Sequence, residues 1–294
     1  MSPHLVILAG GVSSRMKKEL PGGSSAIDAR VLEDVRMKSK AMIGVGKDNL
    51  PFLDYLLYNA RAAGYRDIVI VVGEGDNFIR GCYGNAGRDN RFHELLVSYA
   101  IQKIPAGREK PLGTADALKE ALLLRTDWAG QKFTVCNSDN LYSREALKLL
   151  LDTPHKGAMI DYDRRNLEFS QERIEQFAVI RKNAAGFLTR IIEKPTPEEV
   201  VRCSDVNGRV GVSMNIFRLE YDSILPFLDE VLLHPVRQEK ELPVAVGLLA
   251  AHDPAGVMTI PLAEHVPDLT QPNDIASVQK YLERAFPKFS WDET

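Results

Sequence analysis

A loop rich in glycine, hydroxyl and arginine residues follows an apolar run at residues 5–8 of the 294-residue chain. Its glycines allow a sharp turn with accessible backbone N–H groups, and its arginine adds a planar cation that suits phosphate oxygens. Such a loop after a buried strand predicts a phosphate-binding site, although an ordinary strand-to-helix turn is the alternative. The residues concerned are Leu8, Ala9, Gly10, Gly11, Ser13, Ser14 and Arg15.

A second polar group follows an apolar run at residues 133–136, which predicts another buried strand. Asp139 stands just beyond this run, where a strand of a parallel sheet delivers side chains to the ligand crevice. One carboxylate, together with phosphate oxygens, is a common way of holding Mg²⁺. Asp139 is therefore a candidate metal ligand, and a simple turn formed with Asn140 is the alternative.

Two well-known phosphate motifs are absent from the sequence. No Gly-x-Gly-x-x-Gly pattern occurs, so the dinucleotide-binding fingerprint is excluded. Residues 44–47 read Gly-Val-Gly-Lys, but Asp48 occupies the position where a P-loop requires Ser or Thr. We therefore interpret residues 44–48 as a turn.

Composition and charge limit the classes of partner. A formal net charge of −3 and a pI near 6.1 argue against a nucleic-acid groove, which normally carries a basic excess. No apolar stretch reaches the length of a membrane span, and we expect no membrane partner. Three distant cysteines, Cys82, Cys136 and Cys203, indicate reduced thiols and a cytoplasmic protein. The sequence leaves the oligomeric state open, including a homo-oligomer.

Hydrophobic periodicity predicts an α/β fold in a single domain spanning residues 1–294. The predicted strands are residues 5–8, 67–72, 98–102, 133–136, 158–162, 177–181, 187–192, 210–217 and 257–261. The predicted helices are residues 52–63, 114–124 with Thr114 as the cap, 143–151, 220–233, 240–251 and 273–285. Residues 17–39 are expected to form a loop with one helical turn near residues 29–35.

The loop at residues 8–17 resembles the opening signature of the nucleotidyltransferases that make nucleotide sugars. Further segments resembling that family follow in the family's order, so that the resemblance extends to about residue 276. It implies a Rossmann-like fold with a mixed, mostly parallel central sheet, flanking helices and a small β-rich sugar-binding lobe. Residues 1–156 would then bind the nucleotide, and residues 157–294 the sugar phosphate.

On the nucleotide side, residues 111–118 (Pro-Leu-Gly-Thr-Ala-Asp-Ala-Leu) are similar to a segment in which a glycine lets the base lie against the backbone. The matching positions here are Gly113 and Thr114. Gln102 resembles the glutamine that reads the base edge in many members, and an amide suits a pyrimidine imide such as UTP or dTTP carries. An exposed strand residue is the alternative for Gln102.

On the acceptor side, Glu193, Lys194 and Pro195 match the family's Glu-Lys-Pro motif. The resemblance implies that Lys194 pairs with the phosphate of the sugar phosphate and that Glu193 binds sugar hydroxyls. It also assigns Asn140 and Ala178 to this subsite. Ala178 departs from the usual pattern in its segment, and the departure leaves the identity of the sugar open.

The remaining charged positions concern the triphosphate and the metal. Lys40 occupies the slot of a family lysine that is usually followed by proline, whereas Ala41 follows it here; a solvated surface lysine is the alternative. Residues 266–274 are similar to the segment that carries the second metal ligand, which would be Asp268 beside Asp139. Asp274 in the same segment is alternatively a helix-start carboxylate.

The resemblance implies an enzyme in which a sugar 1-phosphate attacks the α-phosphate of an NTP and releases pyrophosphate, with Mg²⁺ as cofactor. Arg15, Lys40 and Lys194 would be the catalytic cations, because both reactants are anions that must be brought together. One rival is a cytidylyltransferase for phosphocholine or another alcohol phosphate, or an enzyme of the molybdenum-cofactor type. A second rival is a regulatory relative that binds nucleotide without catalysis.

Overall fold

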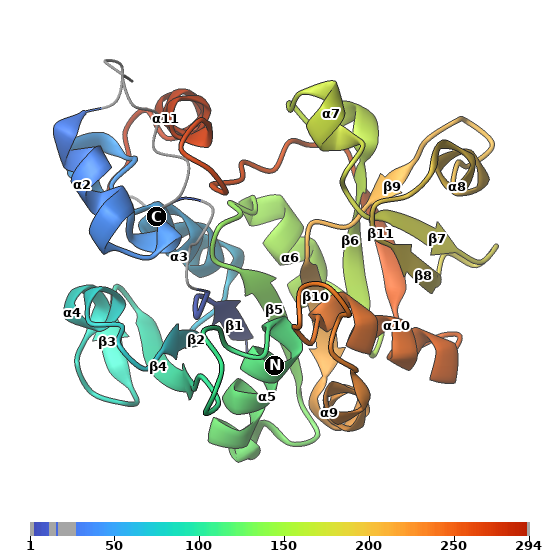
Figure 1. The fold of residues 1–294 in the computed structure, drawn as a ribbon, viewed down its shortest axis with the longest axis horizontal. Coiled ribbons are helices and arrows are strands. Elements are labelled where there is room, and N and C mark those ends of the chain that lie inside the picture. Colours follow the sequence, from blue (N-terminus) through green and yellow to red (C-terminus); the bar gives the residue numbers. More distant parts are fainter. Residues whose placement is uncertain (1–2, 12–15, 17–27, 293–294) are drawn as a thin grey trace.

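One large mixed sheet forms the centre of the computed structural model, which describes residues 3–11, 16 and 28–292 (Figure 1). Its strands are β1 (His4–Leu8), β2 (Asp67–Gly73), β3 (Asn90–Phe92), β4 (Leu95–Gln102), β5 (Lys132–Asn137), β6 (Ala158–Asp163), β7 (Val179–Lys182), β8 (Leu188–Ile192), β9 (Gly211–Val212), β10 (Ile216–Glu220) and β11 (Met258–Leu262). The helices are α2 (Ala29–Met37), α3 (Phe52–Ala63), α4 (Phe78–Tyr83), α5 (Thr114–Leu124), α6 (Arg144–Asp152), α7 (Gln171–Ile174), α8 (Pro197–Arg202), α9 (Tyr221–Glu230), α10 (Leu242–His252) and α11 (Asp274–Ala285).

The strand order is β3-β4-β2-β1-β5-β10-β6-β9-β7-β8, and β11 pairs with β6. Strands β4, β2, β1 and β5 are mutually parallel, whereas β10, β9, β7 and β8 are joined by antiparallel pairing. The chain builds outward from β1 to β2 and β4 and then returns to place β5 on the other side of β1. The carboxyl ends of β1 and β5 therefore form a topological switch point, where α/β sheets bind ligands.

Helices cover both faces of this sheet. Successive residues of β1 alternate between two cores, since Leu5 and Ile7 pack with α2, α3, α6 and α11, while Val6 and Leu8 pack with α5, α9 and α10. This period of two is that of a strand with both faces buried. Among the helices in the described ranges, none combines the length and hydrophobicity that a membrane crossing requires.

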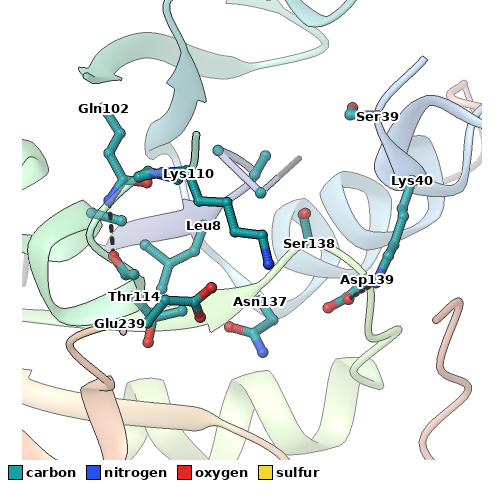
Figure 2. Close-up of a pocket in the computed structure, with 16 residues that line it drawn as sticks. Leu8, Ser39, Lys40, Gln102, Lys110, Thr114, Asn137, Ser138, Asp139 and Glu239 are labelled. Atoms are coloured by element: carbon teal, nitrogen blue, oxygen red, sulfur yellow. Dashed lines mark hydrogen bonds and ion pairs between the residues drawn. The ribbon is translucent and has the colours of Figure 1, made fainter. Parts of the chain in front are cut away.

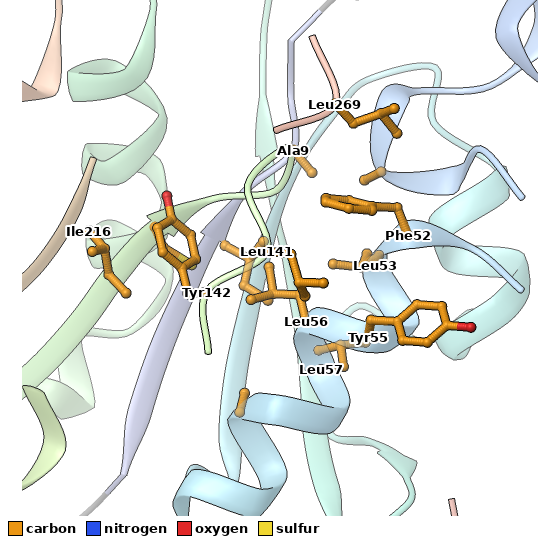
Figure 3. Close-up of a cluster of buried hydrophobic side chains, with 14 of the residues drawn as sticks. Ala9, Phe52, Leu53, Tyr55, Leu56, Leu57, Leu141, Tyr142, Ile216 and Leu269 are labelled. Carbon is orange, nitrogen blue, oxygen red and sulfur yellow. The ribbon is translucent and has the colours of Figure 1, made fainter. Parts of the chain in front are cut away.

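Helix α3 forms the firmest support beneath the carboxyl ends of β1 and β5. Phe52, Leu53 and Leu56 are fully buried and lie against Ala9, which immediately follows β1, and against Leu141 in the loop after β5 (Figure 3). The helix ends at Gly64, whose φ of 108° closes the last turn in the left-handed conformation. The apolar face of α3 thus anchors two loops that carry polar residues.

The α/β fold is confirmed, and three local predictions are wrong. The strand predicted at residues 210–217 is broken into β9 and β10. Between the two, the four residues 213–216 lie opposite only two residues of β6, 160 and 161, so the pairing is interrupted. Asn215 adopts a φ of 55° in this bulge.

Thr114 does not cap α5, since Gly113 holds the cap position and the Thr114 hydroxyl accepts from the N–H of Leu242. Residues 29–37 form a full helix instead of one turn.

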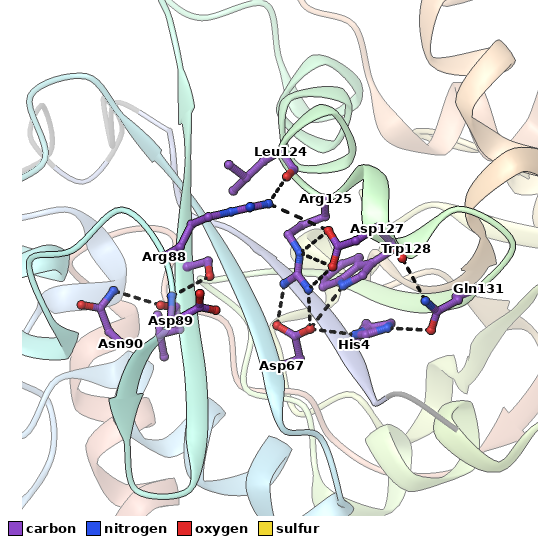
Figure 4. A network of polar contacts seen from close by, with 12 residues as sticks. His4, Asp67, Arg88, Asp89, Asn90, Leu124, Arg125, Asp127, Trp128 and Gln131 are labelled. Atoms are coloured by element: carbon purple, nitrogen blue, oxygen red, sulfur yellow. Dashed lines mark hydrogen bonds and ion pairs between the residues drawn. The ribbon is translucent and has the colours of Figure 1, made fainter.

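A polar network ties together the amino ends of β1 and β2, at the end of the sheet opposite the switch point (Figure 4). The guanidinium of Arg125 donates to both oxygens of Asp67 at 2.6 and 2.7 Å, and Trp128 Nε1 donates to the same carboxylate at 3.2 Å. His4 stacks on Trp128 with its ring centre 4.2 Å away. Burial alone would raise the pKa of Asp67, but His4 and Arg125 outweigh it and hold that pKa well below its usual range.

The depressed pKa of Asp67 predicts an acid-sensitive contribution to stability. Between the unfolded pKa, near 4, and the lower folded pKa, the unfolded chain binds a proton that the folded chain does not, so stability is present above pH 4 and is lost below it. Asp67→Asn should lower the free energy of unfolding at pH 7 by about 3 kcal/mol, since it breaks a partly buried ion pair.

Urea denaturation at pH 7 and pH 3 checks this prediction. The stability difference between the two pH values should be smaller in Asp67→Asn than in the wild type. Asp152→Asn, which alters an exposed carboxylate on α6, should behave like the wild type. An unchanged pH dependence in Asp67→Asn would contradict the assignment.

Candidate active site

A cavity of about 200 Å³ opens at the carboxyl ends of β1 and β5, at the switch point of the sheet. It is lined by residues from the first loop, the 3₁₀ turn Lys40–Met42, the end of β4, the start of α5 and the loop after β5 (Figure 2). A second hollow shares the first loop, Ser39, Gln102 and Pro111 with it. Residues 110 and 111 and Glu239 also line it, so that several segments far apart in the sequence meet at one place.

The first loop contributes the floor of this cavity. Leu8, Ala9, Gly10 and Gly11 all line it, and the N–H of Ala9 donates to Val71 at 2.8 Å. A Cβ atom on Gly10 would lie 2.9 Å from Oε1 of Gln102, whereas one on Gly11 would meet nothing within 4 Å. Ser13, Ser14 and Arg15, which the sequence also assigns to this loop, lie outside the described residues.

Gln102 stands at the end of β4 and is 3% exposed. Its Nε2 donates to the carbonyl of Gly113 and to the carboxylate of Asp116, each at 2.8 Å. The side chain still borders the cavity, so it is a buried polar group and not the exposed strand residue that formed the alternative. A pyrimidine imide could bond to both the donor and the acceptor of a free amide, whereas the donor Nε2 of Gln102 is already bonded within the protein.

Gly113 and Thr114 begin α5 on the rim of the cavity. Gly113 has a φ of 104°, and a Cβ atom there would lie 2.6 Å from the carbonyl oxygen of Lys240. The glycine is therefore required by both its backbone conformation and the close approach of the segment before α10. That segment also brings Glu239 to the cavity wall (Figure 2).

Asp139 and Lys40 form an ion pair on the opposite wall, with Nζ to Oδ2 at 3.0 Å (Figure 2). Lys40 begins a 3₁₀ turn whose next two residues, Ala41 and Met42, are buried and anchor it in the core. The loop is tied further by Asp34 of α2, whose carboxylate accepts from the N–H of Gly44 at 3.0 Å. Lys40 is thereby held in the site and is not a free surface lysine.

Asp268 lies beside Asp139, although the two residues are far apart in the sequence. The N–H of Leu269 donates to the carbonyl of Asp139 at 2.8 Å, and the N–H of Leu141 donates to that of Pro267 at 2.9 Å. Burial and, after it, the charge of Asp139 raise the pKa of Asp268 to about 6, against the opposing effect of Arg173. The fold thus brings these two carboxylates to one place.

Arg173 on α7 counters this negative charge. Its guanidinium donates to Asp268 at 2.6 Å and also pairs with Asp274. Asp274 accepts from the N–H groups of Thr270 and Gln271, each at 2.8 Å, at the start of α11. It thus has the structural role of a helix-start carboxylate. In the described part of the chain, no cluster of three or more His, Cys, Asp or Glu side chains could hold a metal.

The predicted acceptor residues lie farther away. Glu193 and Lys194 follow β8 on the surface and do not line the cavity, and Lys194 has a φ of 45°. The surrounding protein removes water from Glu193 and raises its pKa, although the nearby Arg237 partly offsets this rise. Asn140 is buried in the bridge to Asp268, and the carbonyl of the buried Ala178 accepts from the N–H of Ser213 at 2.9 Å.

Sequence reasoning missed several residues of this site. Lys110 extends across the cavity, and Glu239 faces it from the segment before α10 (Figure 2). Lys110 directly precedes the Pro-Leu-Gly-Thr segment, so its position was a usable signal. Arg173 gave no such signal, since it lies on a four-residue helix and reaches Asp268 only through the tertiary fold.

Several known proteins are similar to this chain in sequence or in fold. A family model described as nucleotidyl transferase matches residues 35–226, a range that contains Lys40, Gln102, Asp139 and Lys194. The bifunctional protein GlmU of Staphylococcus epidermidis is 24% identical over 249 residues, which is 85% of this chain and 46% of that protein. GlmU of Staphylococcus haemolyticus is 25% identical over 256 residues, or 86% and 46% of the two chains. This chain thus spans about half the length of the curated relatives it matches.

Among solved structures, that of UDP-glucose pyrophosphorylase complexed with UDP-glucose superposes with a TM-score of 0.69 at 16% sequence identity. The match covers 97% of this chain and 100% of that one. At this identity the likeness concerns the fold, which includes the switch point between β1 and β5.

The contact between Gly10 and Gln102 predicts that the two glycines of the first loop tolerate alanine differently. Gly10→Ala should destabilise the protein by about 1–3 kcal/mol, because the new methyl group displaces an amide held by two hydrogen bonds. Gly11→Ala should change stability by less than about 0.5 kcal/mol. Urea denaturation of both variants checks this, and equal effects would contradict it.

Proposed function

This chain belongs to the nucleotidyl transferase family, and we propose that it joins a nucleoside triphosphate to a sugar 1-phosphate, giving a nucleotide sugar and pyrophosphate. The observation that carries the proposal is the cavity at the switch point, which has a glycine floor, a buried amide on one wall and the Lys40–Asp139 pair on the other. The fold neighbour complexed with UDP-glucose supports a nucleotide sugar as the product.

The nucleotide would lie across the first loop. Its base would face Gln102 and the Gly113 turn, where the wall offers an amide and exposed backbone, and its phosphates would extend over Gly10 and Gly11 towards Lys40. The N–H groups of such a loop attract phosphate oxygens. Arg15, in the same loop, would add a charge-assisted contact to the departing phosphates. A uracil or thymine base fits the amide on this wall.

Asp139 and Asp268 would hold Mg²⁺. Their fit is supported by the backbone pairing that holds residues 139–141 against residues 267–269 and so brings the two carboxylates to one place. Two protein ligands are few, as expected where substrate phosphates complete the coordination of Mg²⁺. When bound, the ion would neutralise charge on the phosphate oxygens as a Lewis acid.

The protein's own part in the reaction would be to position two anions and offset their repulsion. The phosphate oxygen of the acceptor would attack the α-phosphorus in line, the bond to the β-phosphate oxygen would break, and pyrophosphate would leave. Lys194 would hold the acceptor phosphate, and Lys40 would lie against the triphosphate. No general base is needed, since a phosphate monoester dianion is already a nucleophile.

A substrate panel tests the proposal. Purified protein with Mg²⁺ is assayed for pyrophosphate release from each of four NTPs, in the presence of sugar 1-phosphates or of non-sugar alcohol phosphates such as phosphocholine. Release that depends on both an NTP and a sugar 1-phosphate supports the proposal. Release only with an alcohol phosphate, or nucleotide binding seen by thermal shift without any release, would overturn it.

Asp139 provides a direct test of the metal site. Asp139→Asn should slow pyrophosphate release by about 10²–10³-fold, which is the usual loss when one preorganised charge is removed. Asp152→Asn is the matched control, because it makes the same change on an exposed carboxylate of α6, and it should keep the wild-type rate. A rate near that of the wild type in Asp139→Asn would exclude the proposed metal role.

Lys194 separates acceptor binding from nucleotide binding. Lys194→Ala should raise the KM for the sugar phosphate by about 10–100-fold, since it removes a hydrogen bond between two charged groups, and should leave the KM for the NTP unchanged. Lys156→Ala, at an exposed lysine before β6, serves as the control. An equal rise in both KM values would place Lys194 outside the acceptor subsite.

A further inference from the structure

We propose that Asp116 fixes the amide of Gln102 in one orientation, so that the base meets a hydrogen-bond acceptor and the enzyme selects bases with a ring N–H at that edge. This inference rests on the proposed function, because it assumes that a nucleobase enters the cavity beside Gln102. Asp116 itself does not line the cavity and would act from behind the amide as a positioning residue.

The two hydrogen bonds of Gln102 determine which way its amide faces. Nε2 carries two hydrogens, and its two partners at 2.8 Å are the carbonyl of Gly113 and the carboxylate of Asp116. Both partners accept hydrogen bonds and neither can donate one. The reversed amide would place its carbonyl oxygen against two acceptors and would lose both bonds in a buried environment.

The carbonyl oxygen of Gln102 is therefore the end that is left for a ligand. It faces Gly10, since a Cβ atom built on Gly10 would lie only 2.9 Å from this oxygen. Gln102 and Gly10 both line the cavity, and Figure 2 shows the side chain of Gln102 at its edge. The absent Cβ of Gly10 keeps the space in front of this oxygen clear. A base that lies against the first loop thus meets an acceptor whose direction is fixed.

This acceptor distinguishes bases by the protonation of one ring nitrogen. Uracil and thymine carry an N3–H and guanine carries an N1–H, and each of these groups can donate to the carbonyl. The N3 of cytosine has a lone pair instead and would oppose the oxygen. UTP and CTP form the sharpest comparison, since their sugar, phosphates and ring size are the same.

Without Asp116, only the carbonyl of Gly113 would favour the observed orientation, and the amide could rotate to donate to cytosine. Asp116→Ala should therefore lower the ratio of kcat/KM for UTP over CTP by about tenfold, the effect expected for one hydrogen bond. The loss should appear in the KM values, with kcat for UTP little changed. Asp116→Asn should lower the ratio by less than Asp116→Ala, because its side-chain amide can accept from Nε2 but can also donate to the carbonyl of a reversed Gln102 amide.

A double-mutant cycle shows whether Asp116 acts through Gln102. In a Gln102→Ala background the ratio should already be reduced, and adding Asp116→Ala should change it no further. Glu120→Ala is the matched control, since it removes a carboxylate one turn further along α5, outside the cavity lining, and should keep the wild-type ratio.

The outcomes separate this inference from the proposed function. If the wild type releases no pyrophosphate from any NTP, the proposed function fails. The proposed orientation of Gln102 would still be supported if UTP stabilises the wild type more than CTP does in a thermal-shift assay, and if Asp116→Ala abolishes this difference. If the wild type is active, the inference is overturned by a preference for CTP, by an unchanged ratio in folded Asp116→Ala, or by additive effects in the cycle.

Discussion

The site depends on the backbone pairing that holds residues 139–141 against residues 267–269. This pairing places two carboxylates side by side at the end of β5, and their repulsion, together with burial, raises the pKa of Asp268. The fold offsets that repulsion with two cations from unrelated elements, Lys40 on Asp139 and Arg173 on Asp268. Four distant segments thereby converge on one place, where each of the two carboxylates is paired with a cation.

The two ends of the parallel strands are built differently. At the amino ends, Asp67 is fully engaged by Arg125 and Trp128, and His4 packs on the same indole ring (Figure 4). At the carboxyl ends, glycines and short side chains leave the backbone open to the cavity. The closed network holds β1 and β2 in register, and the open end can therefore present backbone N–H groups without distorting the sheet.

The sequence was sufficient for the α/β fold, because a run such as residues 68–72 is apolar throughout and such a run predicts a strand buried on both faces. It also indicated that polar residues after β1 and β5 would share one edge of the sheet. It did not reveal the bulge at residues 213–216, since residues 210–216 alternate between apolar and small or polar residues as they would in an uninterrupted strand. The contact of Arg173 with Asp268 and the loss of the cap at Thr114 depend on tertiary partners, which local patterns do not encode.

The segment at residues 234–241 connects the nucleotide side of the site to the acceptor side. Its Lys240 accepts from the N–H of Ala115 at 3.0 Å and occupies the space that a Cβ of Gly113 would need. The same segment carries Arg237, which acts on the pKa of Glu193 at the end of β8. A displacement of this segment would therefore disturb Gly113, and with it one of the two acceptors that hold Gln102, as well as the surroundings of Glu193. In this fold, the residues proposed to recognise the base and those proposed to bind the acceptor share one structural support.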